Sequence, residues 1–160
     1  MTDSLSLKPG CMGFLQKLFA PPGGGGAGGP WPYAKKQYLL SKAEFSFYRV
    51  LSQACAGSFV VCPKVRLGDL LYVKKGADKP MGWINKINRN HIDFVLCNPQ
   101  TMQVVAAVEL DDSSHNGEKA KKRDADKDQA CRDAGLPLVR VRARRSYDVG
   151  EIKAALPGLG

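Results

Sequence analysis

Two apolar runs separated by a short polar turn constrain the fold of this chain more than any other feature. Residues 91–97 read His-Ile-Asp-Phe-Val-Leu-Cys, and residues 103–110 read Gln-Val-Val-Ala-Ala-Val-Glu-Leu. Runs of this length, rich in apolar and β-branched residues, predict strands. The intervening Asn-Pro-Gln-Thr-Met has turn chemistry. The sequence therefore predicts an antiparallel hairpin.

A helix and a strand are predicted before this hairpin. Ser41 is followed three residues later by Glu44 in a capping-box pattern, and apolar residues continue at helical spacing. We expect a helix over residues 42–55, ended by Gly57. The β-branched run at 59–67 predicts a strand, in which Pro63 favours an edge position or a bulge.

The remaining segments complete a mixed α/β pattern. Residues 68–90 predict a short helical or irregular segment and a basic loop, anchored by Trp83 and Ile84. A helix is expected over 118–134, ended by a glycine, and a strand over 138–142. The order helix, strand, hairpin, helix, strand predicts an α/β fold with a mixed sheet.

The N-terminal part of the chain differs in composition from the rest. Residues 21–30 are almost entirely Gly and Pro, which predicts a flexible tether without a core. We expect a short N-terminal segment at 1–20, a linker at 21–38 and one folded domain at 39–157. Within the first segment, residues 12–20 can form an amphipathic helix that contacts a membrane or a protein, or they can be a frayed terminus.

Charge and cysteine content narrow the functional classes. The formal net charge of +9 favours a polyanionic partner, and nucleic acid is the first candidate. Five cysteines without a C-x-x-C pair predict reduced, mostly buried thiols, which is typical of the cytoplasm. No apolar stretch near the start is long enough to span a bilayer, and a signal peptide is not expected because only Lys8 precedes the apolar residues 12–20 as a basic residue.

Acidic residues inside the hairpin are the strongest functional signal. Asp93 interrupts the first apolar run, and Glu109 and Asp111 close the second. Side chains alternate along a strand, so Glu109 and Asp111 share a face, and a hairpin can place Asp93 beside them. Converging carboxylates are typical of a Mg²⁺ or Mn²⁺ site. The alternative is that these acids are strand ends paired with Lys or Arg.

Basic residues after the hairpin are candidates for chemistry and for phosphate binding. Lys127 lies on a helical stripe that can face the acids, where it can orient water or pair with neighbouring aspartates. His115 is a candidate general acid or base. The candidate phosphate-binding rim, for which solvated surface charge is the alternative, consists of Lys121, Lys122, Arg123, Arg140, Arg142 and Arg144.

Several of these motifs together resemble a bacterial family of proteins, the domain of unknown function 2726 (DUF2726). The resemblance extends from Leu40 to about Leu156, and its most specific element is Glu-Leu-Asp-Asp-x-Ser-His at 109–115. It implies membership of the PD-(D/E)XK, or restriction-endonuclease-like, superfamily, near the very-short-patch repair endonucleases. It therefore implies a three-layer α/β/α sandwich with a mixed central sheet.

The resemblance also implies roles for individual residues. Asp93 corresponds to the aspartate of the superfamily motif and Glu109 to its second acid, while Asp111 stands where many members have lysine. Glu44 matches a helix acid that assists the metal. The implied function is Mg²⁺- or Mn²⁺-dependent hydrolysis of DNA.

Two other functions fit the same sequence. A non-catalytic nucleic-acid-binding module would keep the fold and the basic rim, and its binding would depend steeply on salt. An interaction protein would use the tether to present residues 12–20 to a membrane or a protein partner.

Overall fold

The computed structural model describes residues 31–111, 117–156 and 158, and it divides the chain into two units, residues 1–37 and 38–160. Of the first unit, residues 31–37 are described, and the rings of Trp31 and Tyr33 lie 5.7 Å apart there. The predicted N-terminal segment and most of the predicted linker lie outside the described residues. The second unit contains all the described helices and strands.

Helix α2 (Lys42–Ala54) begins at the capping box that the sequence predicts. The Ser41 side chain accepts a hydrogen bond from the Glu44 amide, and the Glu44 carboxylate accepts one from the Ser41 amide. Together these bonds satisfy two backbone donors that a helix start leaves free. Phe47, Leu51 and Ala54 form the buried side of the helix.

Four strands form one mixed sheet in the order β1-β2-β3-β4. Strands β2 (His91–Cys97) and β3 (Val104–Asp111) pair antiparallel, so the predicted hairpin is confirmed. Strand β1 (Val60–Arg66) pairs antiparallel with β2, and β4 (Leu138–Arg142) pairs parallel with β3. Helix α5 (Glu118–Ala134) is part of the connection between the two parallel strands and is capped by Gly135 at φ 71°.

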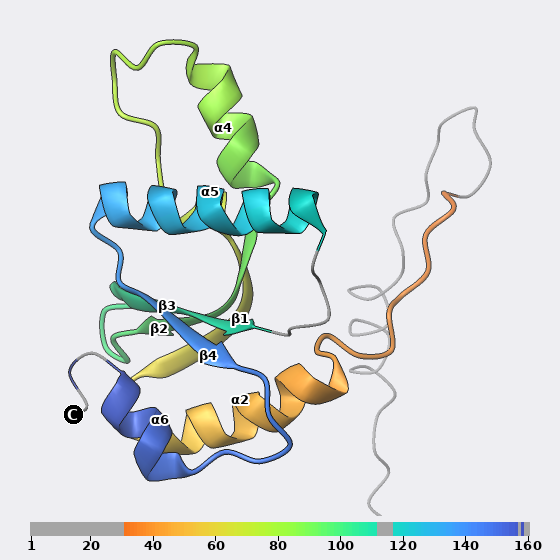
Figure 1. Ribbon diagram of the computed structural model, residues 1–160, viewed down its shortest axis with the longest axis vertical. Coiled ribbons are helices and arrows are strands. Elements are labelled where there is room, and N and C mark those ends of the chain that lie inside the picture. The colour runs from red at the N-terminus through yellow and green to blue at the C-terminus, as the bar shows by residue number, and fades with distance from the viewer. Residues whose placement is uncertain (1–30, 112–116, 157, 159–160) are drawn as a thin grey trace, which may run out of the picture. The chain divides into compact units, whose positions relative to one another are not determined.

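Helices cover both faces of the sheet (Figure 1). Helices α2 and α6 (Val149–Ala155) lie on one face, around a core that includes Phe47, Phe94 and Ile152. Helix α5 lies on the other face, where a second core includes Ile92, Val95 and Cys131. The fold is therefore α/β with a mixed sheet between two helical layers.

Residues 67–90 contain the predicted short helical segment and basic loop, and in addition a second helix that the sequence did not predict. They form two helices, α3 (Leu67–Leu70) and α4 (Pro80–Asn88). Ile87 packs against the second core, whereas Trp83 is 52% exposed. Of the two residues expected to anchor this segment, Trp83 bonds the Asp78 carbonyl of the preceding loop and does not pack into the core, and Ile84 is partly buried. No described helix is long and apolar enough to cross a membrane.

Lys64 has an unusual backbone conformation in β1. Its φ angle is 57°, in the left-handed region that non-glycine residues rarely adopt. The residues on either side pair in register with β2, Pro63 with Phe94 and Val65 with Ile92. Lys64 therefore lies beside Asp93 of the neighbouring strand.

Candidate active site

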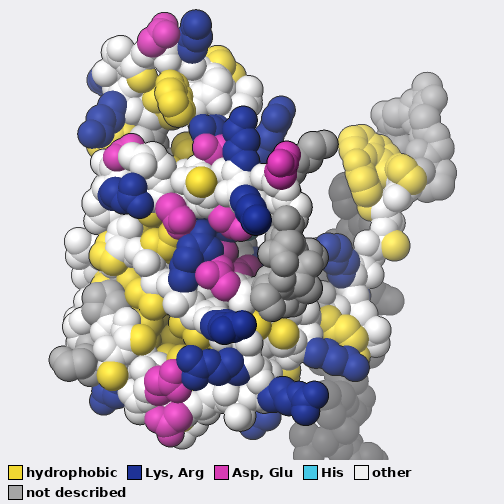
Figure 2. All heavy atoms as spheres, in the orientation of Figure 1, with side chains coloured by type: hydrophobic (Ala, Val, Ile, Leu, Met, Phe, Trp, Pro, Cys, Tyr) yellow, Lys and Arg dark blue, Asp and Glu magenta, His cyan; other side chains and the backbone are white. Residues whose placement is uncertain are grey.

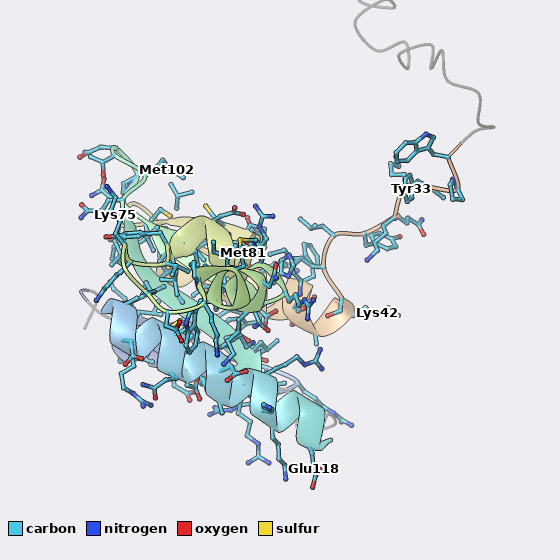
Figure 3. All side chains as sticks on the ribbon, turned by 90° about the horizontal axis from the view of Figure 1, so that it is seen from above. Tyr33, Lys42, Lys75, Met81, Met102 and Glu118 are labelled. Carbon is cyan, nitrogen blue, oxygen red and sulfur yellow. The ribbon has the colours of Figure 1, made fainter. Side chains whose placement is uncertain are left out.

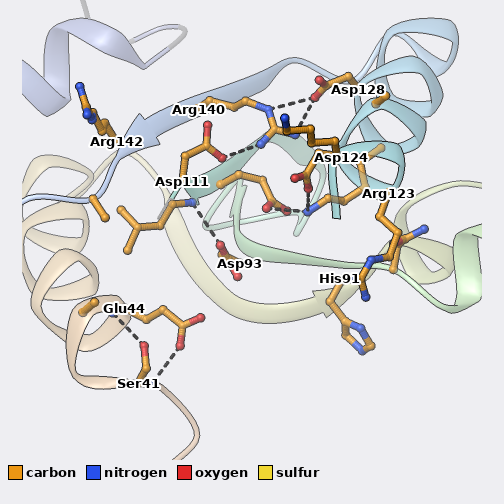
Figure 4. A pocket seen from close by; sticks show the side chains of 18 of the residues that line it. Ser41, Glu44, His91, Asp93, Asp111, Arg123, Asp124, Asp128, Arg140 and Arg142 are labelled. Carbon is orange, nitrogen blue, oxygen red and sulfur yellow. Dashed lines mark hydrogen bonds and ion pairs between the residues drawn. The ribbon is translucent and has the colours of Figure 1, made fainter. Parts of the chain in front are cut away.

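A pocket of about 1250 Å³ lies at the end of the sheet where β2 begins and β3 and β4 end. The N-terminus of α2 and one side of α5 complete it (Figure 4). Its acidic lining residues are Glu44, Asp93, Glu109, Asp111, Asp124 and Asp128. Its basic lining residues are Arg89, Lys121, Arg123, Lys127, Arg140 and Arg142. The pocket thus gathers carboxylates from two strands and two helices.

Asp93 is held by its strand neighbours on both sides. Its Oδ2 accepts a hydrogen bond from the Leu110 amide at 3.1 Å, across the β2–β3 pair. Its Oδ1 accepts one from Lys64 Nζ at 3.1 Å, across the β1–β2 pair. The carboxylate of Asp93 is therefore fixed between two strands and lines the pocket.

Lys64 joins Asp93 to Glu44, because its ammonium group also donates a hydrogen bond to Glu44 Oε1. Burial of Glu44 favours a higher pKa, but hydrogen bonds from Lys64 and Ser41 outweigh burial and lower the pKa of this carboxyl. Burial of Lys64 favours a lower pKa, and its bonds to the two acids outweigh burial and raise it. Glu44 and Lys64 are therefore both charged at neutral pH.

Glu109 is the most buried acid of the pocket, with a side chain 7% exposed. Its Oε2 accepts a hydrogen bond from Lys127 Nζ at 2.7 Å, whereas its Oε1 is buried and has no hydrogen-bond partner among the described residues. Burial raises the pKa of Glu109, and the bond to Lys127 reduces that rise while the charge of Asp93 adds to it. A buried oxygen without a donor is costly unless a cation or water satisfies it.

Asp111 belongs to a second group of charges around Arg140. The guanidinium of Arg140 contacts Asp111 Oδ1 at 2.6 Å and donates two hydrogen bonds to Asp128 Oδ1, at 2.8 and 3.0 Å. Burial opposes the charge of Arg140, but the bonds to Asp128 and Asp111 outweigh it and raise its pKa. Figure 4 shows this arginine between the two aspartates. Arg140 is thus engaged by carboxylates within the pocket.

These contacts bear on whether the residues fit a metal ion. In the described part of the chain, no three His, Cys, Asp or Glu side chains are arranged as a metal-binding group. The acids instead contact Lys64, Lys127 and Arg140. The oxygen donors are those that a hard cation prefers, and the unpartnered Oε1 of Glu109 is an available ligand atom. The donor atoms are therefore of the kind that a divalent ion takes, while the three acids are paired with cations in the described residues.

The predicted phosphate-binding residues separate into three groups. Lys121, Arg123 and Arg142 line the pocket, are exposed, and form no ion pair with a described acid. Arg140 also lines it but is paired. Lys122 and Arg144 are not lining residues, and Arg144 bonds Glu151 at 2.8 Å. His115 lies outside the described residues.

Two pocket features were not expected from the sequence. His91, at the start of β2, lines the pocket, as does Arg89 just before it. The Lys64 ammonium bridges two of the predicted acids, although Lys64 precedes Asp93 by 29 residues in the chain. The signal that was available for Lys64 is Pro63, which predicts an edge strand, and β1 is the edge strand beside β2.

The surface around the pocket is mixed in charge. In Figure 2, acidic and basic side chains alternate in the region between α5 and the layer of α2 and α6, with further basic side chains below them. Such a surface can attract an anion through Lys121, Arg123 and Arg142, called here the outer cations, while carboxylates line the inside of the pocket.

Comparison with known proteins places this domain in a family. A family model described as "Protein of unknown function (DUF2726)" matches residues 36–159. The chain belongs to the DUF2726 family. The region matched by the DUF2726 model includes every residue that lines the pocket. No match was found among the curated proteins or among the solved structures.

Proposed function

We propose that this DUF2726 protein is a metal-dependent nuclease that hydrolyses phosphodiester bonds in DNA, with a site of the PD-(D/E)XK type. The observation that supports this most is Glu109, whose buried Oε1 has no partner among the described residues and lies in a pocket shared with Asp93 and Asp111. A hard divalent cation would satisfy that oxygen. The arrangement of a mixed sheet between two helical layers is compatible with a restriction-endonuclease-like sandwich.

Asp93, Glu109 and Asp111 would hold Mg²⁺ or Mn²⁺, with Glu44 assisting from α2. When bound, such an ion lowers the pKa of a coordinated water and neutralises charge on the phosphate. Asp93 is suited to this role because the Leu110 amide fixes its orientation. Lys127 positions Glu109 through their hydrogen bond and retains further ammonium donors for a water or a phosphate oxygen.

The outer cations bind the substrate in this proposal. Arg123 and Arg142 are exposed, line the pocket and form no ion pair with a described acid, so they are available for phosphate groups. Lys121 belongs to the same group. Arginine suits this role because its guanidinium matches the geometry of phosphate oxygens.

A second candidate function is binding of nucleic acid without catalysis. The observation that favours it is the pairing of the candidate metal ligands with Lys64, Lys127 and Arg140. If these ion pairs are permanent, the ammonium and guanidinium groups neutralise the carboxylates in place of a metal ion. In that case the outer cations bind nucleic acid and the acids serve only the fold.

Plasmid nicking distinguishes the two functions. Purified wild-type protein is incubated with supercoiled plasmid in Mg²⁺, in Mn²⁺ and in EDTA, beside Asp93→Asn and Asp133→Asn. Asp133 is an exposed acid at the end of α5 and is the matched control. The nuclease predicts metal-dependent nicking by wild type and Asp133→Asn but not by Asp93→Asn. Plasmid binding without nicking in either metal would support the non-catalytic function.

A further inference from the structure

The segment of residues 71–89, called here the α4 lobe, exposes large hydrophobic side chains beside the pocket. Tyr72 is 85% exposed, Met81 63% and Trp83 52%, and α4 contains no buried residue. Figure 2 shows hydrophobic side chains on this lobe with basic side chains around them. Trp83 leaves about half of its surface in solvent, so its ring is a candidate contact surface.

The charge of the α4 lobe is strongly positive. It contains five basic residues, Lys74, Lys75, Lys79, Lys86 and Arg89, and one acid, Asp78. The ammonium of Lys86 lies 5.3 Å from the centroid of the Trp83 ring. The indole nitrogen of Trp83 donates a hydrogen bond to the Asp78 carbonyl at 3.0 Å, which fixes the ring. The lobe therefore combines a fixed aromatic ring with cations.

The lobe is continuous with the pocket. Arg89 follows α4 directly and lines the pocket. Lys86 also contacts Asp126 of α5 at 2.8 Å, and Figure 3 shows α4 beside α5 from above. On α5, Lys122 and Arg123 lie one helical turn before Asp126, and Arg123 lines the pocket. Basic groups thus extend from Trp83 to the candidate active site.

We propose that the α4 lobe binds single-stranded nucleic acid, with an unpaired base stacked on Trp83 and neighbouring phosphates contacted by its lysines. Aromatic rings stack on bases only where the base faces are free, as in a single strand. In a duplex those faces are covered, and the ring would contribute little. The inference deepens the proposed function by naming a substrate class, a nucleic acid with an unpaired segment next to the cleavage site.

The surface of the α4 lobe fits an anionic membrane less well than it fits single-stranded nucleic acid. Membrane-surface helices present a broad apolar face. In α4, Ile87 packs into the protein, which leaves Met81 and Trp83 as the exposed large hydrophobic residues of the helix.

Fluorescence anisotropy of a labelled oligo(dT), titrated with full-length protein in EDTA, tests the inference. Trp83→Ala is compared with Trp31→Ala, a second exposed tryptophan that lies outside the lobe. Stacking of one base predicts that Trp83→Ala weakens binding roughly fivefold or more, and that Trp31→Ala leaves it unchanged. In Trp31→Phe protein, the oligonucleotide should quench the fluorescence of Trp83. Equal affinities of wild type and Trp83→Ala would overturn the inference.

A second variant tests the lobe independently of Trp83, and binding to duplex DNA and to vesicles tests other partners. Lys75→Ala, in the lobe, should reduce the salt dependence of binding, and Lys153→Ala, on α6, should not. A Trp83→Ala effect on duplex DNA as large as that on oligo(dT), or confined to anionic vesicles, would overturn the inference. Because EDTA prevents cleavage, binding is measured separately from nuclease activity. If wild type does not nick plasmid but Trp83→Ala weakens oligo(dT) binding, the inference is supported and only the nuclease function is contradicted.

Discussion

The ammonium group of Lys127, on helix α5, lies 2.7 Å from Glu109 Oε2, on strand β3. The contact joins a helix to the sheet in an environment where the two side chains are 10% and 7% exposed. It compensates one charge of a buried carboxylate and leaves the other oxygen without a partner among the described residues. The Lys127–Glu109 pair is therefore both a contact between helix and sheet and a part of the candidate site.

Removal of Lys127 alone is expected to be strongly destabilising. Lys127→Met leaves the Glu109 carboxylate buried without a cation, which costs about 3–5 kcal/mol. The double variant Lys127→Met with Glu109→Gln removes both charges and should recover much of that loss. Urea unfolding of the two single variants and the double variant gives the coupling free energy. Additive changes in the free energy of unfolding would show that the two residues do not interact.

Lys64 is expected to compete with a divalent cation. Lys64→Ala leaves Glu44 and Asp93 without their shared ammonium and should lower the free energy of unfolding by about 1–3 kcal/mol. Mg²⁺ or Mn²⁺ should raise the melting temperature of this variant more than that of wild type, because binding to the folded state stabilises it. Lys42→Ala, an exposed lysine on the same helix as Glu44, is the control. Equal metal-induced shifts in all three proteins would contradict the competition.

The outer cations should differ from the paired ones in their effect on nucleic-acid binding. Arg123→Ala removes an exposed pocket residue and should weaken DNA binding and reduce the salt slope by about one. Arg144→Ala breaks a contact with Glu151 away from the pocket and should leave both unchanged. Anisotropy titrations at several salt concentrations measure the slopes. A larger loss for Arg144→Ala than for Arg123→Ala would place the phosphate contacts elsewhere.

The buried thiol of Cys55 predicts a loss of stability at high pH. Burial raises the pKa of Cys55 from 9.0 to about 11. As pH rises through this interval, the unfolded chain loses a proton that the folded protein keeps, so the free energy of unfolding falls. Below pH 9 the contribution is constant. Cys55→Ala should fall less steeply than wild type in urea unfolding across this interval, and parallel curves would contradict the prediction.

Local sequence signals predicted much of the fold. The capping box at Ser41 and Glu44 defined the start of α2, and the turn at 98–102 joined the strands of the hairpin. These elements were predictable because their stabilising contacts lie close together in the chain. Helix α6 was not expected, since its seven residues give too short a pattern. Its packing depends on Ile152 reaching the core that α2 shares with the sheet.

The partners of the candidate site residues were harder to predict than the acids themselves. Arg140 was expected to bind phosphate, but the parallel pairing of β4 with β3 sets it opposite Glu109, and its guanidinium reaches Asp111 two residues further along β3. Lys64 reaches Asp93 because its own backbone is in the left-handed region and because the register of β1 on β2 sets the two residues side by side. Both contacts depend on strand register between distant segments, which residue patterns in one sequence do not specify.

Calorimetric titration of Mn²⁺ into wild type, Glu109→Gln and Glu151→Gln tests the central claim most directly. Glu151 is an exposed acid on α6, which makes its substitution the matched control. If the buried carboxylate of Glu109 is a metal ligand, wild type and Glu151→Gln bind Mn²⁺, and Glu109→Gln binds it at least about tenfold more weakly. Equal Mn²⁺ affinity of Glu109→Gln and wild type, or no binding by wild type, would contradict the account.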